Sequence, residues 1–133
     1  MKYVLHLLIF GLIFSVTSCK NVSPDAVELS VDFTWEGMKP CGWGNPEIRV
    51  SGVPENTKFL KVHMYDHAYF HDHGTVMVPY TGDGIIARDR FEEIQGPCPI
   101  DVPGRYEITI KAIDEKEVVI GIGSKERYFP EEK

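Results

Sequence analysis

Short segments in which apolar and polar residues alternate recur from Val27 towards the end of the chain. In the first segment, Val27, Leu29, Val31, Phe33 and Trp35 are each separated by one polar residue. Successive side chains of a β-strand point to opposite faces, so this spacing predicts a strand that buries one face and exposes the other. A chain built from such segments must pair them and cover the apolar face of the resulting sheet.

Further strand signals follow in “EIRVSGVP”, “FLKVHMYD”, “TVMVPY”, “RYEITIKAI”, “EVVIGIG” and “ERYF”, with turn residues between them. Several short strands separated by turns are typical of an all-β sandwich. The best candidate for a short helix is Arg88–Ile94. We therefore predict an antiparallel β-sandwich with at most one or two short helices, formed by residues 27–133 as a single domain.

Residues 1–18 have the layout of an export signal, with Lys2 ahead of an apolar run from Tyr3 to Phe14. The run is shorter than the ~20 residues that a membrane-spanning helix requires. We therefore predict that residues 1–18 are a signal peptide that is removed from the mature protein.

The sequence Val16-Thr17-Ser18-Cys19 resembles a bacterial lipobox, in which the cysteine is lipidated and becomes the new amino terminus. The alternative is an ordinary signal peptide with an incidental cysteine. Acyl chains on Cys19 would anchor the protein durably to a membrane, and residues 19–26 would be the lipidated cysteine and a polar spacer. Lys20 is not the aspartate associated with retention in the inner membrane, which favours an outer-membrane lipoprotein that faces the periplasm.

The charge of the mature chain restricts its partners. Removal of residues 1–18 takes away one of 14 basic residues and none of 20 acidic residues, which leaves a formal charge of −7. An acidic chain is not expected to bind nucleic acid or to adhere generally to anionic lipid. We expect the lipid on Cys19 to provide the membrane attachment.

Two further cysteines, Cys41 and Cys98, lie in loops bounded by proline and glycine. An exported protein meets oxidising conditions, so we predict a disulfide between them. A reactive thiol is the competing interpretation, but neither cysteine is paired with a histidine in the sequence.

The segment “YDHAYFHDHG” concentrates His67, His71 and His73 in what we expect to be a loop after a strand. Imidazoles at positions i and i+2 share a face in an extended chain and can chelate zinc or copper. The alternative is a solvated polar loop, since no second pair of ligands stands elsewhere in the sequence.

The motifs of common enzymes are missing from the sequence. It contains no Gly-x-Ser-x-Gly elbow, no phosphate-binding glycine-rich loop and no His-Glu-x-x-His. We therefore expect a protein that is not an enzyme and has no cofactor.

The segments “NPEIRVSGVPENTKFLKVHMYD”, “GPCP” and “GRYEITIKAID”, with a histidine-glycine pair before the second, resemble the phosphatidylethanolamine-binding protein (PEBP) family, also called Raf kinase inhibitor-like proteins. The resemblance covers about Phe33 to Pro130 and is strongest to short exported bacterial members. It implies an antiparallel β-sandwich with a small anion-accepting pocket at one end.

The resemblance also implies which residues form that pocket. Asp66 and His73 match an acid and a histidine of the pocket, Gly96, Pro97 and Pro99 match its wall, and Tyr106 matches its tyrosine. Two positions depart from the pattern. Ala68 replaces a second acid, and Gly104 replaces a second histidine.

Three functions remain open at this point. The first is a non-catalytic, membrane-tethered module that binds a small anion or a phosphoryl headgroup through His73 and Tyr106. The second is a protein-interaction or inhibitor module that uses the loops of the same scaffold and an unknown protein partner. The third is a metal-binding lipoprotein that uses His67, His71 and His73.

Overall fold

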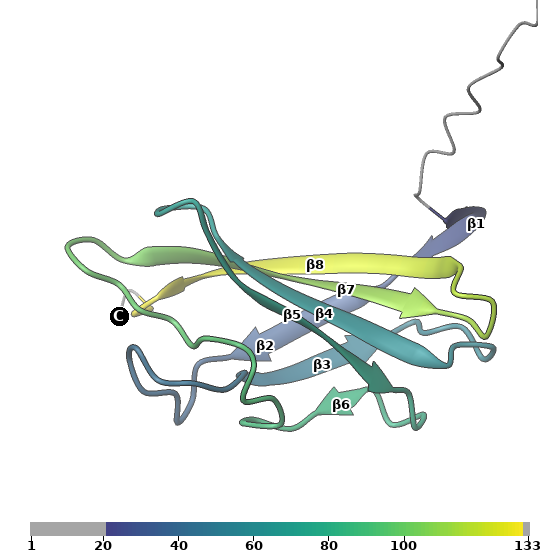
Figure 1. Ribbon diagram of the computed structural model, residues 1–133, viewed down its shortest axis with the longest axis horizontal. Coiled ribbons are helices and arrows are strands. Elements are labelled where there is room, and N and C mark those ends of the chain that lie inside the picture. The colour runs from purple at the N-terminus through teal and green to yellow at the C-terminus, as the bar shows by residue number, and fades with distance from the viewer. Residues whose placement is uncertain (1–20, 132–133) are drawn as a thin grey trace, which may run out of the picture.

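The computed structural model describes residues 21–131, which form strands and no helix. The strands are β1 (Val22–Glu28), β2 (Ser30–Thr34), β3 (Glu47–Ser51), β4 (Phe59–Asp66), β5 (His71–Pro79), β6 (Ile85–Ile86), β7 (Gly104–Ile113) and β8 (Val119–Phe129). They form a five-stranded sheet with the order β1-β8-β7-β4-β5 and a three-stranded sheet with the order β2-β3-β6. The two sheets face each other (Figure 1), so the predicted all-β sandwich is confirmed. Since residues 21–131 contain no helix, they contain no candidate membrane-spanning helix.

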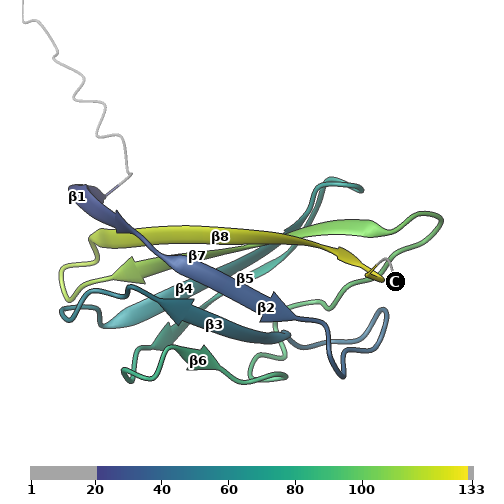
Figure 2. The same cartoon turned by 180° about the vertical axis from the view of Figure 1, so that it is seen from behind.

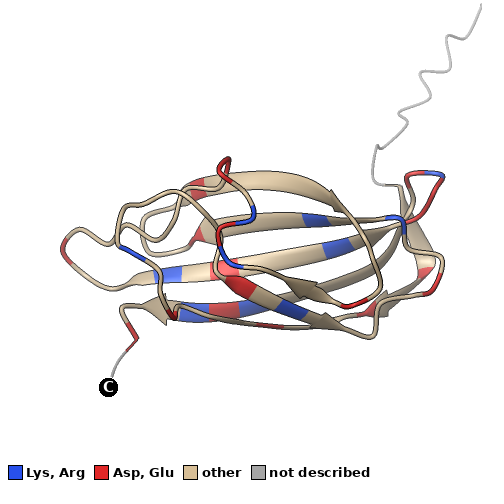
Figure 3. Ribbon diagram, turned by 90° about the horizontal axis from the view of Figure 1, so that it is seen from below, with Lys and Arg blue, Asp and Glu red and all other residues tan. Residues whose placement is uncertain are grey.

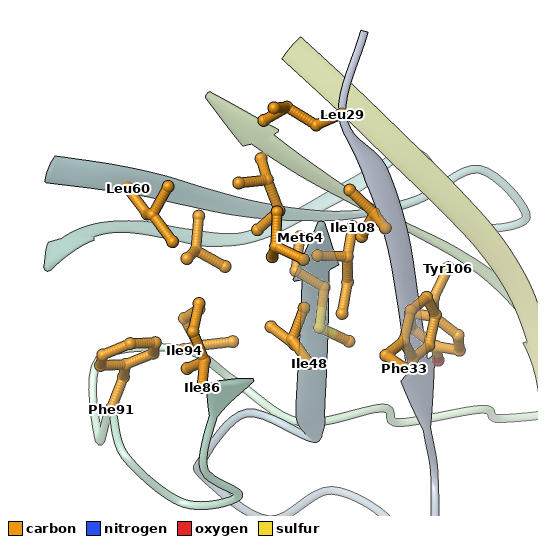
Figure 4. Close-up of a cluster of buried hydrophobic side chains, with 14 of the residues drawn as sticks. Leu29, Phe33, Ile48, Leu60, Met64, Ile86, Phe91, Ile94, Tyr106 and Ile108 are labelled. Atoms are coloured by element: carbon orange, nitrogen blue, oxygen red, sulfur yellow. The ribbon is translucent and has the colours of Figure 1, made fainter. Parts of the chain in front are cut away.

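The alternating segments bury the faces that the sequence predicts. The buried side chains are Ile48 and Val50 in β3, Leu60, Val62 and Met64 in β4, and Tyr106, Ile108, Ile110 and Ala112 in β7. Figure 4 shows that side chains from both sheets point towards one another between the layers. Burial of each large apolar side chain contributes roughly 1.5–3 kcal/mol, so this layer is the main source of stability.

The strand predicted from Val27 to Trp35 is divided at Leu29, and its two halves belong to different sheets. The Leu29 amide donates to the Ile122 carbonyl at 2.9 Å, and the Leu29 carbonyl passes so close to Gly123 that a Cβ at position 123 would collide with it. Glycine in β8 therefore allows the chain to cross from one sheet to the other. A period of two cannot reveal such a crossing, because the alternation continues through it.

The first strand differs from the expected pattern in two ways. β1 pairs with β8 in parallel, whereas every other strand pair is antiparallel. It also begins at Val22, so strand structure starts inside the stretch 19–26 that we expected to be a spacer. Val27 is 44% exposed, because β1 lies at the edge of its sheet. The predicted signal peptide (residues 1–18) and Cys19 lie outside the described residues.

The prediction of a short helix at Arg88–Ile94 is wrong, because this segment consists of turns. Asn45 provides the physical reason. Its backbone carbonyl accepts from the Asp89 amide at 2.9 Å, and its side-chain Oδ1 accepts from the Phe91 amide at 3.0 Å. Those amides are thus bonded to Asn45 rather than within a helical turn, while Phe91 and Ile94 are buried in the core.

The two ends of the molecule differ. β1, where the described chain begins, lies at one end of the long axis, and the β4–β5 turn and the loop before β7 lie at the other (Figures 1 and 2). β8 runs between these ends with 11 residues, which corresponds to roughly 36 Å of strand. A group attached just before β1 is therefore far from the β4–β5 turn.

Candidate functional site

A hollow of about 280 Å³ opens at the end of the molecule opposite to β1. Asp66 closes β4, Tyr69 belongs to the turn that follows, and His71 and His73 begin β5. The wall is completed by the segment before β7, and the full lining is Asp66, Tyr69, His71, His73, Gln95, Cys98 and Ile100. The fold therefore brings together two of the expected site residues, Asp66 and His73, in one pocket.

The carboxylate of Asp66 is buried at the base of this pocket, with 1% of its surface exposed. Its Oδ1 accepts from the backbone amides of Ala68 at 2.7 Å, Tyr69 at 3.3 Å and Arg105 at 3.2 Å. These donors offset the cost of burying a charged group. They also fix the β4–β5 turn against the start of β7. Ala68, where the family resemblance implies a second acid, contributes its backbone amide to the same oxygen.

Tyr106 lies behind the pocket and is fully buried. Its hydroxyl oxygen accepts from the Cys98 amide at 3.0 Å. Burial, the nearby charge of Asp66 and a hydrogen bond to that carboxylate raise the pKa of Tyr106 above its ordinary value of 10. The hydroxyl therefore remains protonated. We expected Tyr106 to be a ligand donor; it does not belong to the residues that line the pocket, and its hydroxyl oxygen accepts from the Cys98 amide.

His73 is also buried, with 5% of its surface exposed. Its Nδ1 lies 2.9 Å from the Gln95 carbonyl oxygen, which can only accept, so Nδ1 carries a proton and donates it. Burial lowers the pKa of His73 below its ordinary value of 6.5. The imidazole is therefore neutral at pH 7, and Nε2 is the nitrogen available to a ligand.

The wall segment is fixed by backbone contacts and by the predicted disulfide. Cys41 and Cys98 form this bond, and the Cys41 amide donates to the Pro97 carbonyl at 2.8 Å. The Gly96 amide donates to the Gly42 carbonyl at 2.8 Å. Gly96, Pro97 and Pro99 do not line the pocket, and Cys98 is the member of this segment that does.

Sequence reasoning did not identify Gln95 and Tyr69 as site residues. Gln95 binds His73 through its carbonyl and accepts from His71 Nε2 at 3.1 Å through its side-chain oxygen. The Tyr69 hydroxyl accepts from the amides of residues 100, 101 and 102 at 3.1 Å each and lies 3.0 Å from the Val102 carbonyl. The only sequence signal was position, since Gln95 precedes the Gly-Pro wall and Tyr69 stands in the histidine-rich turn.

The rim of the pocket is apolar and exposed. Phe70 is 83% exposed, Ile100 77%, Trp43 67% and Val102 55%. Phe70 and Ile100 flank Tyr69 and its hydrogen-bonded loop, and Trp43 pairs with Gln95 through an isolated β-bridge. Exposed apolar side chains on segments that adjoin a pocket are typical of a contact surface.

The three histidines of the expected metal site are not gathered together. His67 Nε2 lies 2.6 Å from Glu107 Oε2, whereas His71 and His73 line the pocket with ring centroids 4.8 Å apart. Within residues 21–131 no group of three His, Cys, Asp or Glu side chains is arranged to hold a metal ion. His71 and His73 both face the pocket, as their i, i+2 spacing predicts. They lie on β5, however, and not in the loop that we expected.

Comparisons with known proteins agree with this fold. Neither models of protein families nor curated proteins match the sequence. Among solved structures, the chain is similar to the crystal structure of Escherichia coli YbcL, described as a new member of the mammalian PEBP family. The TM-score is 0.55 and the sequence identity 18%, over 80% of this chain and 98% of YbcL. The chain therefore has the fold of the phosphatidylethanolamine-binding protein family.

Proposed function

We propose that the protein is a non-catalytic, exported binding module, tethered to a membrane by lipid on Cys19, whose pocket accepts a small oxyanion or a phosphoryl group. The observation that carries the proposal is the fixed ring of His73. Its Nδ1 is held by the Gln95 carbonyl at 2.9 Å, so Nε2 has one orientation and a bound group needs no rearrangement of the imidazole.

The charges of the pocket define which anions suit it. Neutral His73 offers a lone pair at Nε2, and Asp66 places a carboxylate at the base of the pocket. A fully ionised anion would meet two acceptors there. An anion that brings a proton, such as the monoanion of phosphate, can donate to Nε2 and accept from the side-chain NH2 group of Gln95. Protonation of His73 produces the same complementarity, so we expect binding to strengthen at acidic pH.

The position of the pocket bears on the source of the ligand. Only Lys20 separates Cys19 from Asn21, so the tether reaches about 10 Å at most. The pocket lies at the opposite end of the long axis from β1 (Figure 1). A domain that stands on its tether therefore turns the pocket away from its own membrane, which favours a free phosphoryl compound over a headgroup of the anchoring bilayer.

A titration of the processed protein with inorganic phosphate tests the binding proposal. We expect the melting temperature to rise with phosphate concentration, because a ligand that binds only the folded state stabilises it. His73→Ala should reduce the phosphate-dependent rise, whereas His67→Ala, on a ring bonded to Glu107 outside the pocket, should keep it in full. The absence of any phosphate-dependent shift in the unmodified protein at pH 5.5 to 7.5 would contradict the proposal.

Tethering requires its own test. Mass spectrometry of the processed protein should find an amino terminus at Cys19 that carries acyl chains, and the protein should enter the detergent phase in a phase-separation assay. Cys19→Ser should prevent acylation and leave the chain in the aqueous phase or uncleaved. Cleavage without acylation would support an ordinary signal peptide instead.

The apolar rim supports a second function, an interaction or inhibitor module that uses the loops. The Tyr69 hydroxyl holds the loop that presents Ile100 and Val102, so these side chains are displayed at little additional cost in entropy. A pull-down from envelope extract should lose its partner when Phe70 and Ile100 are changed to serine and keep it in His73→Ala. Loss in His73→Ala alone would instead connect the partner to the pocket.

A further inference from the structure

The outer face of the five-stranded sheet has a second hollow, separate from the pocket of Asp66 and His73. It measures about 330 Å³ and is lined by Lys61, His63, Thr75, Thr109 and Lys111. The three-stranded sheet covers the opposite face (Figure 1), so this hollow opens away from the core. None of its residues belongs to the pocket proposed above.

The strand register determines how these side chains face one another. Lys61 of β4 pairs directly with Lys111 of β7. On the next residue pair along the same face, His63 lies between Thr75 of β5 and Thr109 of β7. The five side chains therefore form two adjacent rows on neighbouring strands. Figure 3 shows basic positions side by side on neighbouring strands in the middle of the sheet.

The two lysines lack the carboxylates that would normally neutralise them. Like charges directly opposite each other across a strand pair are destabilising. Every ion pair within residues 21–131 is made by arginine or histidine, so neither Lys61 nor Lys111 takes part in one. This is notable in a chain with 20 acidic and 14 basic residues.

The acidic residues nearest to this face are already occupied. Asp72 Oδ1 lies 3.2 Å from His63 Nε2, and Glu107 Oε2 lies 2.6 Å from His67 Nε2. Hydrogen bonds lower the pKa of both carboxyl groups, from the Gly74 amide for Asp72 and from His67 for Glu107. The hollow itself thus contains ammonium, hydroxyl and imidazole groups and no carboxylate.

We propose that this hollow is a second anion site that binds the phosphoryl group of a phosphate ester. Two ammonium groups provide the charge that a dianion requires, and the threonine hydroxyls donate to its remaining oxygens. The hollow is shallow and open, so each contact is weakened by water. We expect a dissociation constant on the order of 1 mM at low ionic strength and weaker binding as salt screens the charges.

Backbone-amide NMR of the processed protein tests the site at residue resolution. The probes are inorganic phosphate, glycerol 3-phosphate and soluble dihexanoyl phosphatidic acid, each titrated at constant ionic strength. We expect saturable shifts at Lys61, His63, Thr75, Thr109 and Lys111. Equal affinities for glycerol 3-phosphate and the short-chain lipid identify a free phosphate ester as the ligand, and inorganic phosphate measures the contribution of the phosphoryl group alone. Affinity at least about tenfold higher for the short-chain lipid identifies a lipid headgroup.

The variants separate this site from general charge effects. Lys61→Gln with Lys111→Gln should weaken binding at least about fivefold, whereas Lys116→Gln with Lys125→Gln removes the same charge elsewhere and should not. His73→Ala should leave the shifts at this face unchanged, so the two sites can fail separately. Shifts that are not saturable, or that persist in the Lys61/Lys111 variant, would overturn the proposal.

Discussion

The ring of Tyr106 fills the space beside Gly104 that a side chain at position 104 would need. A Cβ built on Gly104 would collide with the Tyr106 hydroxyl and the ring carbons next to it. Gly104, where the family resemblance implies a histidine, is therefore the position that leaves room for the Tyr106 hydroxyl to reach the Cys98 amide.

This relationship predicts a cost for any side chain at position 104. Gly104→Ala should lower the free energy of unfolding by about 1–3 kcal/mol, because overpacking displaces a buried ring. In a Tyr106→Ala background the same change should cost much less, since the obstacle is gone. Urea denaturation of the four proteins measures the coupling, and equal costs in both backgrounds would show that the collision is relieved elsewhere.

Burial of His73 predicts how stability depends on pH. Because its pKa in the folded protein lies below 6.5, the unfolded chain takes up a proton at higher pH than the folded chain. Stability should therefore fall as the pH decreases from about 6.5 through the folded-state pKa. Asp72 and Glu107, whose pKa values are lowered, contribute stability that is lost at more acidic pH.

Urea denaturation between pH 7.5 and 5 measures this dependence. His73→Gln, which cannot titrate, should reduce the slope in that range, and His71→Gln at the exposed neighbouring position is the matched control. An unchanged slope in His73→Gln would mean that other groups account for the dependence.

The Cys41–Cys98 disulfide predicts a second contribution to stability. The cysteines are 57 residues apart in the sequence, and a crosslink of that span is typically worth about 2–4 kcal/mol because it restricts the unfolded chain. Cys41→Ser with Cys98→Ser should lower the urea midpoint accordingly. A reducing agent should produce the same loss in the unmodified protein and none in the double variant. A midpoint unchanged by both treatments would contradict this contribution.

The lysine pair on the outer face predicts a stabilising substitution. Lys61→Glu places a carboxylate opposite Lys111 and should raise the free energy of unfolding by about 0.2–1 kcal/mol. Lys116→Glu makes the same charge change in an exposed turn and serves as the control. If Lys61→Glu lowered the free energy of unfolding more than Lys116→Glu does, Lys61 and Lys111 would not repel each other.

The sequence predicts the β layers well and their connections poorly. Leu60, Val62 and Met64 lie inside as their alternation requires, because side-chain period and burial are local properties. The parallel pairing of Val22 with Val119 joins residues that are far apart in the sequence, and a local pattern cannot predict which distant strand a strand will pair with. The helix prediction for Arg88–Ile94 was wrong for a related reason, since amides of this segment donate to Asn45, which is distant in the sequence.

The part of the site that lies where β4 ends and β5 begins could be predicted from the sequence. Asp66 and His73 meet because β4 and β5 are joined by a short turn. The role of Tyr106 behind the pocket was not predictable, since it depends on a ring position that only packing against Gly104 defines. Gln95 was not predictable, because it accepts the hydrogen bond from His73 with its backbone carbonyl, a group that every residue has.

The most direct test of the claim that the pocket binds an anion is the pKa of His73. It can be measured by NMR titration of the buried imidazole with and without inorganic phosphate at constant ionic strength. If phosphate binds in the pocket and prefers the protonated ring, its presence must raise the pKa of His73 from the lowered value in the free protein. The imidazole signals of His67, which is bonded to Glu107 outside the pocket, should not respond to phosphate. A pKa of His73 that phosphate leaves unchanged would contradict the account of this pocket as an anion site.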